Sequence, residues 1–190
     1  MTPQRPGLLI DRSRSVLVLV DYQERLMPAI ADSSVVLGRA ALLGRIATQL
    51  RIPVVGTEQN PSRLGANLPE VARCCGTVLA KMSFGACGDG LLAHLSGLPE
   101  RDGPRDVVIA GCEAHVCLLQ TALPLLETGD RVWVVGDASG SRRPGDHALA
   151  MSRLRQAGAN IVSVEMVAFE WLRTCEDADF KAVSALVKSG

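Results

Sequence analysis

The stretch VVIAGCEAHVCLLQTALPLLETG, residues 107–129, reads as a strand, a tight turn and an amphipathic helix. Its first four residues are apolar and mostly β-branched, which is typical of a strand buried on both faces. Gly129 follows the helical pattern at the position where helices commonly end in a left-handed residue. These features predict a strand over Asp106–Gly111 and a helix over His115–Glu127.

The same alternation extends in both directions along the chain. Short apolar runs predict five more strands, at Val16–Asp21, Pro53–Thr57, Thr77–Ala80, Arg131–Gly136 and Asn160–Val164. Helical patterns cover Ser34–Leu50, Gly88–Ser96 and Pro144–Gln156, with a tail helix near Ala178–Lys188. Strand–helix–strand alternation implies parallel pairing through right-handed crossovers. The expected fold is therefore a single α/β domain over residues 1–190: a three-layer, doubly wound, mostly parallel six-stranded sheet with helices on both faces.

Composition narrows the possible partners and the compartment. Hydrophobic residues make up 47% of the chain, and twenty basic residues balance twenty acidic ones. Without a basic stripe we expect neither nucleic acid nor a membrane surface as a partner. The longest apolar runs, such as 16–20, fall far short of the roughly 20 residues that span a bilayer. Because no signal peptide is recognisable, the six cysteines are expected to be thiols in a cytoplasmic protein.

Cys117 has the most informative context of the six cysteines. It lies in the first turn of the helix that follows the 106–111 strand, where free N–H groups and the helix dipole favour a thiolate. This position predicts a pKa below the usual value of about 8.5. On position alone, however, a buried helix cysteine explains Cys117 equally well.

Asp21 and Lys81 give Cys117 a chemical context. Asp21 closes the first predicted strand, and Lys81 follows the third. Considered alone, Asp21 would be interpreted as a helix cap and Lys81 as a solvated charge. In a doubly wound sheet, however, functional groups gather at the carboxyl ends of the strands, where all three residues fall. An acid, a cation and a thiol there form a plausible nucleophile site. A pairing of His115 with Cys117 is less favoured, because residues two apart on a helix do not face each other.

Three motifs resemble the isochorismatase-like cysteine hydrolase family. They are V-L-V-D-Y-Q at 18–23, K-M-S-F at 81–84 and G-C-E-A-H-V-C at 111–117. The resemblance runs from about Ser15 to Leu172. Within the family, T-E-Q-N-P at 57–61 and S-V-E-M-V-A-F-E at 163–170 most resemble the isochorismatase-domain-containing subgroup.

The resemblance implies roles for individual residues. Cys117 would be the nucleophile, Asp21 the base and Lys81 the stabilising cation. The backbone N–H groups of Glu113 and Cys117 would form the oxyanion hole, beside a non-proline cis peptide between Cys112 and Glu113. The positions that would line the substrate pocket are Gln23, Phe84 and Asn60. Gln23 as a helix-cap amide and Phe84 as a core side chain are equally compatible with the sequence.

The resemblance also bears on whether the protein uses a metal or a cofactor. Nicotinamidases of this family carry an Asp and His metal cluster after the second strand, whereas this chain has Thr57, Glu58, Gln59 and Asn60. We therefore expect no metal and no cofactor. The expected activity is hydrolysis of a small amide or related acyl compound by a homo-oligomer. Vinyl-ether hydrolysis and a non-catalytic scaffold are the alternatives.

Overall fold

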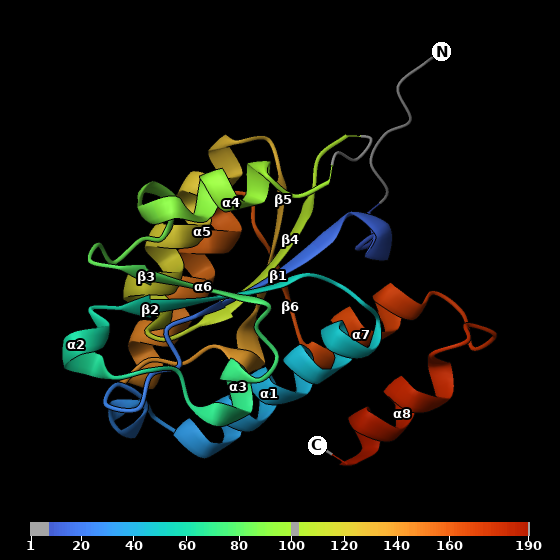
Figure 1. Cartoon of the computed structure of the whole chain (residues 1–190), viewed down its shortest axis with the longest axis horizontal. Coiled ribbons are helices and arrows are strands. Elements are labelled where there is room, and N and C mark those ends of the chain that lie inside the picture. The colour runs from blue at the N-terminus through green and yellow to red at the C-terminus, as the bar shows by residue number, and fades with distance from the viewer. Residues whose placement is uncertain (1–7, 100–102, 190) are drawn as a thin grey trace.

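The computed structural model describes residues 8–99 and 103–189 and contains one six-stranded sheet (Figure 1). The strands are β1 (Ser15–Val20), β2 (Val54–Gln59), β3 (Thr77–Lys81), β4 (Asp106–Gly111), β5 (Arg131–Val135) and β6 (Asn160–Val162). Their order is β3-β2-β1-β4-β5-β6, and every neighbouring pair is parallel. The predicted doubly wound sheet is confirmed, and its strand order reverses between β1 and β4.

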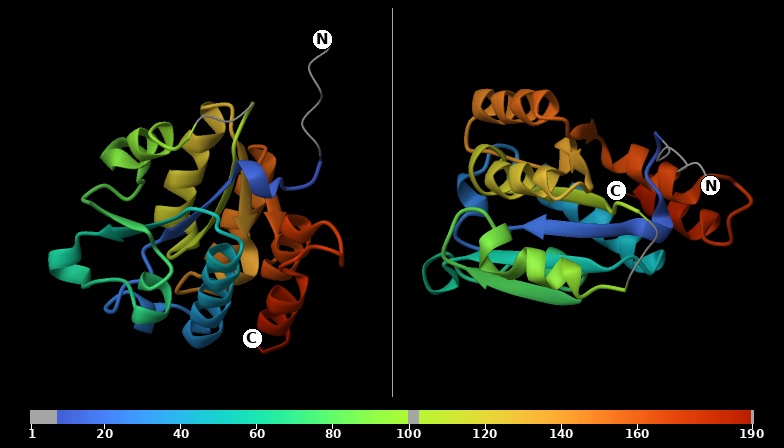
Figure 2. Two further views of the ribbon diagram at one scale, coloured as in Figure 1. Left: turned by 45° about the vertical axis from the view of Figure 1, so that its right-hand side comes forward. Right: turned by 90° about the horizontal axis from the view of Figure 1, so that it is seen from above.

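Helices cover both faces of the sheet (Figures 1 and 2). They are α1 (Ser33–Gln49), α2 (Pro61–Leu64), α3 (Pro69–Ala72), α4 (Leu92–Ser96), α5 (Leu119–Glu127), α6 (Pro144–Gln156), α7 (Val164–Leu172) and α8 (Phe180–Ser189). Short 3-10 or π turns occur at Arg12–Arg14, Met27–Ala29, Cys87–Leu91, Ala114–Leu118 and Gly136–Ala138. Helices α1, α7 and α8 pack on one face, and α5 and α6 pack on the other.

Strand β1 shows why the sheet reads as continuous apolar runs. All six of its residues are buried. Leu17 and Leu19 join the core under α1 and α7, whereas Val16, Val18 and Val20 join the core under α5 and α6. Successive side chains of a strand point to opposite faces, so a strand between two helical layers is apolar at nearly every position. The polar exception, Ser15, is hydrogen-bonded to the Asp11 oxygen at 2.7 Å and to Trp171 Nε1 at 2.9 Å.

The sequence prediction missed helix α7 and gave β6 two extra residues. Strand β6 ends at Val162, because Ser163 caps the following helix by accepting a hydrogen bond from the Met166 N–H at 3.2 Å. Five of the nine residues of α7 are buried. A short segment that is apolar on most sides cannot be told from a buried strand by its periodicity.

The six cysteines are free thiols, as the sequence predicts. All six cysteines lie in the described part of the chain, and none forms a disulfide. Cys112 is fully buried, as expected of a small apolar side chain at a strand end. Among residues 8–99 and 103–189, no helix has the length and apolar character that a membrane span requires.

Gly111 allows β1 and β4 to meet closely at the point where the strand order reverses. Its register partner is Val20, and a Cβ on Gly111 would lie 2.5 Å from the Val20 Cβ and 2.6 Å from the Val20 oxygen. Because both strands are buried, neither can move aside cheaply. The residues that follow, Asp21 and Cys112, are placed by this contact.

We expect Gly111→Ala to lower the free energy of unfolding by about 1–3 kcal/mol, because the added methyl overpacks the sheet. Gly38→Ala is the matched control: its Cβ would meet nothing within 4 Å on the exposed face of α1. That change should stabilise the protein by about 0.5–1 kcal/mol through helix propensity. Urea unfolding of both variants measures the difference, and equal effects at the two glycines would contradict the close contact.

Candidate active site

Three strand ends bring the candidate residues together. Val20 pairs with Thr57 of β2 on one side and Gly111 of β4 on the other. Asp21 follows Val20 in a left-handed conformation, with φ of 57°. Lys81 is the last residue of β3 and joins the site from beyond β2. The site therefore lies at the carboxyl ends of the strands, where their order reverses.

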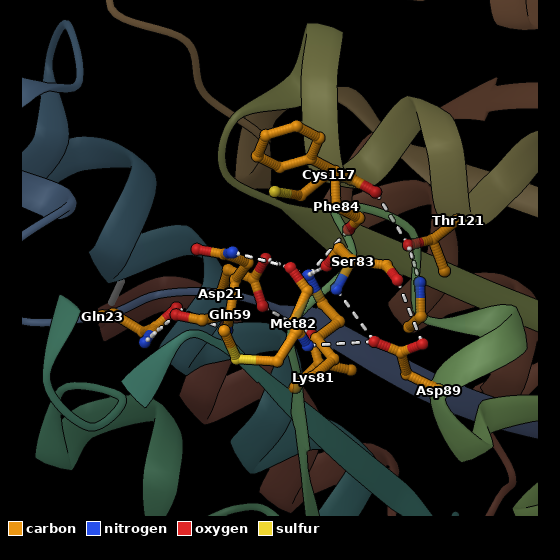
Figure 3. A network of polar contacts seen from close by, with 12 residues as sticks. Asp21, Gln23, Gln59, Lys81, Met82, Ser83, Phe84, Asp89, Cys117 and Thr121 are labelled. Carbon is orange, nitrogen blue, oxygen red and sulfur yellow. Dashed lines mark hydrogen bonds and ion pairs between the residues drawn. The ribbon is translucent and has the colours of Figure 1, made fainter. Parts of the chain in front are cut away.

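A buried ion pair joins Asp21 to Lys81 (Figure 3). The Lys81 Nζ donates to Asp21 Oδ2 at 2.7 Å, and neither side chain has any exposed surface. Thr57 Oγ1 donates to the other carboxylate oxygen at 2.7 Å. Nζ also donates to the backbone oxygens of Phe84 at 2.7 Å and Ser83 at 3.3 Å. The three ammonium protons thus have three acceptors, as a buried cation requires.

Cys117 is only 6% exposed, and its sulfur lies beside the Asp21 carboxylate and the Lys81 ammonium. Burial first, and then the charge of Asp21, raise the pKa of the Cys117 thiol to about 12. Lys81 and the backbone N–H of Glu113 oppose this rise in pKa. The prediction of a lowered pKa was wrong, since burial and an adjacent carboxylate outweigh a helix terminus. Cys117 is therefore held as a protonated thiol beside the Asp21 carboxylate.

The turn after β3 is ordered by Asp89, a residue that the sequence analysis did not single out. Its carboxylate accepts from the N–H groups of Met82 at 3.0 Å and Ser83 at 2.9 Å, and from Ser83 Oγ at 3.1 Å. These hydrogen bonds lower the pKa of Asp89. The turn that they fix presents the two carbonyl groups that hold Lys81.

Thr121 ties this turn to the helix that carries Cys117. Its Oγ1 donates to the Cys117 oxygen at 2.7 Å and accepts from the Ala86 N–H at 3.1 Å (Figure 3). Thr121 is fully buried. No sequence pattern marked it, because its partner Ala86 lies 35 residues away.

The Cys112–Glu113 peptide is cis, as the family resemblance predicted. The buried carboxylate of Glu113 forms an ion pair with Arg142 Nη2 at 2.6 Å, and Arg142 Nε adds bonds at 3.0 and 3.2 Å. Burial raises the pKa of Glu113, but the bonds from Arg142 outweigh it and the net pKa is lowered. The Glu113 side chain is therefore engaged by Arg142, while its backbone N–H lowers the pKa of Cys117.

The three expected pocket residues differ in their surroundings. Gln23 is buried; its Nε2 donates to the oxygens of Gly65 at 2.7 Å and Gln59 at 3.0 Å, and its Oε1 accepts from the Gln59 N–H at 2.8 Å. These bonds occupy the amide, so Gln23 fixes the end of β2 and does not present its polar atoms to a substrate. Phe84 is 52% exposed, which argues against a core position. Asn60 binds the Lys81 oxygen through its backbone N–H at 2.8 Å.

The remaining candidates have structural partners. His115 Nδ1 lies 2.9 Å from Ser141 Oγ, so a pairing of His115 with Cys117 is not supported. At the end of β2, Glu58 accepts from the Asn67 N–H at 2.8 Å while Thr57 binds Asp21. Within the described ranges, no group of three His, Cys, Asp or Glu side chains is placed to hold a metal ion.

This geometry has counterparts in known proteins. The isochorismatase domain model matches residues 15–166. Isochorismatase domain-containing protein 2 of Xenopus laevis is 35% identical over 184 residues, covering 97% of this chain and 88% of that protein. The secreted isochorismatase effector Isc1 of Phytophthora sojae is 35% identical over 97% of this chain and 89% of its own. The structure of MAR1 ribonuclease from Caenorhabditis elegans superposes with a TM-score of 0.87 at 31% identity, covering 95% of this chain and 92% of that one.

Fold and site together define a doubly wound α/β protein of the hydrolase type, with a cysteine at the point where the strand order reverses. The chain belongs to the isochorismatase family, and the resemblance of its three motifs is confirmed.

We expect iodoacetamide to alkylate Cys117 slowly at pH 7, with a rate that rises about tenfold per pH unit beyond pH 9, because only the thiolate reacts. Asp21→Asn should accelerate this alkylation, since the charge of the carboxylate raises the pKa of Cys117. Mass spectrometry locates the label, with exposed Cys175 as the internal reference. A rate at Cys117 that levels off below pH 8 would contradict the raised pKa.

Proposed function

We propose that this chain is a metal-independent cysteine hydrolase that cleaves the C–N bond of a small amide or related acyl compound. The observation that carries the proposal is the placement of the buried Cys117 thiol beside the Asp21 carboxylate, which is itself held by hydrogen bonds from Lys81 and Thr57. A nucleophile, a base and an orienting group within hydrogen-bond reach are what covalent acyl transfer needs. Residues 1–190 would act as one domain.

The proposed reaction begins with attack of the sulfur on the substrate carbonyl carbon. As the C–S bond forms, the thiol proton passes to Asp21, so a free thiolate need not accumulate despite the raised pKa. The protonated Asp21 then gives this proton to the leaving nitrogen, and the C–N bond breaks to leave a thioester. Water attacks the thioester with Asp21 again as base, and the proton returns to the sulfur as the acid is released.

Lys81 acts on this sequence through charge. Its ammonium holds Asp21 in place and lowers the pKa of Cys117, which favours the developing thiolate. The N–H groups of Glu113 and Cys117 would stabilise the tetrahedral oxyanion. The backbone N–H of Glu113 lowers the pKa of Cys117, which supports this assignment because it places a donor near the sulfur. One good donor is worth roughly 3–4 kcal/mol of transition-state stabilisation.

Phe84 and Asn60 are the proposed pocket residues. The ring of Phe84 is half exposed and could stack on a planar acyl group. The backbone N–H of Asn60 donates to the Lys81 oxygen, and this bond positions the loop that follows β2. Gln23 takes a positioning role instead, because its amide is bound by the main chain.

A ribonuclease activity is the second candidate, and it rests on the similarity to the C. elegans MAR1 ribonuclease. Balanced charge over the whole chain favours a small substrate over RNA. Isochorismatase-type vinyl-ether hydrolysis differs from the amide reaction in a testable way, because it can proceed without a cysteine nucleophile. A scaffold without catalysis would show none of these activities.

Self-association and a cytoplasmic location belong to the same proposal. Val78, Met82 and Phe84 expose apolar side chains on β3 and the turn that follows, at the edge of the sheet. A second copy of the chain could cover them. Six free thiols favour a reducing compartment, although one similar protein is described as secreted.

We expect a screen of small amides, ureas and carbamoyl compounds to show ammonia release that Cys117→Ala and Asp21→Asn each reduce by at least about a thousandfold. Thr57→Val should reduce turnover less, because Lys81 still holds Asp21. Cys175→Ala, which changes the exposed cysteine, is the matched control and should keep full activity. Circular dichroism checks the fold of each variant. Full activity in Cys117→Ala would exclude the covalent route.

Turnover should survive dialysis against a chelator, because Glu58 and Thr57 are already engaged within the protein. The measurement is ammonia release before and after dialysis, together with metal analysis of the purified protein. Loss of activity that zinc or iron restores would refute metal independence.

A further inference from the structure

A cavity of about 540 Å³ lies at the opposite end of the molecule from Cys117, where the strands begin. Arg45 of α1, Arg51 just beyond α1 and Arg73 at the end of α3 all line it, together with Thr48 and Cys74. Helix α8 closes one side through Leu186. Helix α1 starts beside the carboxyl ends of the strands and runs back to their amino ends, so the cavity is separate from the candidate active site (Figure 1).

A glycine brings two of these arginines together. A Cβ on Gly44 would lie 2.8 Å from the Cβ of Cys74, so only glycine lets the end of α3 lie against α1 at this point. Arg45 and Arg73 are the chain neighbours of these two contacting residues and are therefore held close to one another. Both guanidinium groups act on the same sulfur: burial raises the pKa of Cys74, and Arg45 and Arg73 each oppose the rise.

The three guanidinium groups have no ion pair or side-chain hydrogen bond within residues 8–99 and 103–189. No acidic side chain of the described chain lines the cavity. The nearby Asp179 feels the charge of Arg51, but its carboxylate is bound by Gln49 at 2.9 Å and Arg12 at 2.9 Å. All three arginines are exposed, so solvent screens their charges, and their placement around one cavity favours an anion as its occupant.

We propose that this cavity binds a small phosphate-bearing molecule. Guanidinium groups match phosphate oxygens in paired hydrogen bonds, and Thr48 supplies a neutral donor beside them. A volume of about 540 Å³ is in the range of small-molecule sites and fits a phosphorylated metabolite. The arginines surround one cavity and do not form an extended stripe, which favours a small anion over a nucleic acid. This site is independent of the proposed hydrolysis.

Calorimetric titration of the full chain with pyrophosphate at low ionic strength tests the proposal. Saturable binding is expected, and it should weaken as salt screens the charges. Arg45→Gln and Arg73→Gln should each weaken binding by at least about tenfold, the loss of one charged hydrogen-bonding partner. Arg153→Gln, an exposed arginine of α6 on the other face of the sheet, is the matched control and should bind as the unaltered protein does.

Two further measurements locate the bound anion. Cys117→Ala should keep pyrophosphate binding, because the candidate active site is separate. Bound pyrophosphate should slow alkylation of Cys74 by iodoacetamide in proportion to occupancy, while exposed Cys175 reacts unchanged. The proposal is overturned if pyrophosphate does not saturate, if Arg45→Gln and Arg73→Gln bind it normally, or if only a single-stranded RNA oligomer binds.

Discussion

The buried ion pair between Asp21 and Lys81 is the constraint on which the rest of the site depends. Both side chains lack exposed surface, and either charge alone in the core would cost several kcal/mol. The pair is tolerable because its remaining donors and acceptors are satisfied by Thr57 and two carbonyls of the 82–84 turn. That turn in turn needs Asp89 to order it. The ends of β1, β2 and β3 are therefore fixed by one polar cluster, which ties the fold to the chemistry.

Opposing effects determine the pKa of Cys117 beside this cluster. Burial and Asp21 keep the sulfur protonated, whereas Lys81 and the Glu113 N–H favour the thiolate. A protonated thiol resists adventitious alkylation and oxidation, because the thiolate is the reactive form. In the proposed mechanism, the thiol proton passes to Asp21 when a carbonyl group arrives, so activation of the nucleophile is coupled to the bound substrate.

Basic and acidic residues balance over the whole chain, but they are distributed unevenly in the structure. At the carboxyl ends of the strands, each buried ion has an internal partner. At the amino ends, Arg45, Arg51 and Arg73 share a cavity without an acidic residue in its described lining. Helix α1 connects the two regions as one rigid element of seventeen residues. The overall composition could exclude a basic stripe along the chain but could not reveal a local cluster assembled from α1 and α3.

The sequence by itself determined the strands, their parallel pairing and the strand ends at which Asp21, Lys81 and Cys117 lie. These follow from local periodicity and from chain connectivity, both of which are written in consecutive residues. Tertiary structure decided what sequence could not show. The pKa of Cys117 depends on its burial in the folded protein. The side-chain amide of Gln23 is hydrogen-bonded to two segments that lie far away in the sequence. Thr121 accepts a hydrogen bond from Ala86, which is 35 residues away. Arg45 and Arg73 line the same cavity only because the end of α3 packs against α1 at Gly44. Each of these depends on contacts between residues far apart in the chain, which no local pattern records.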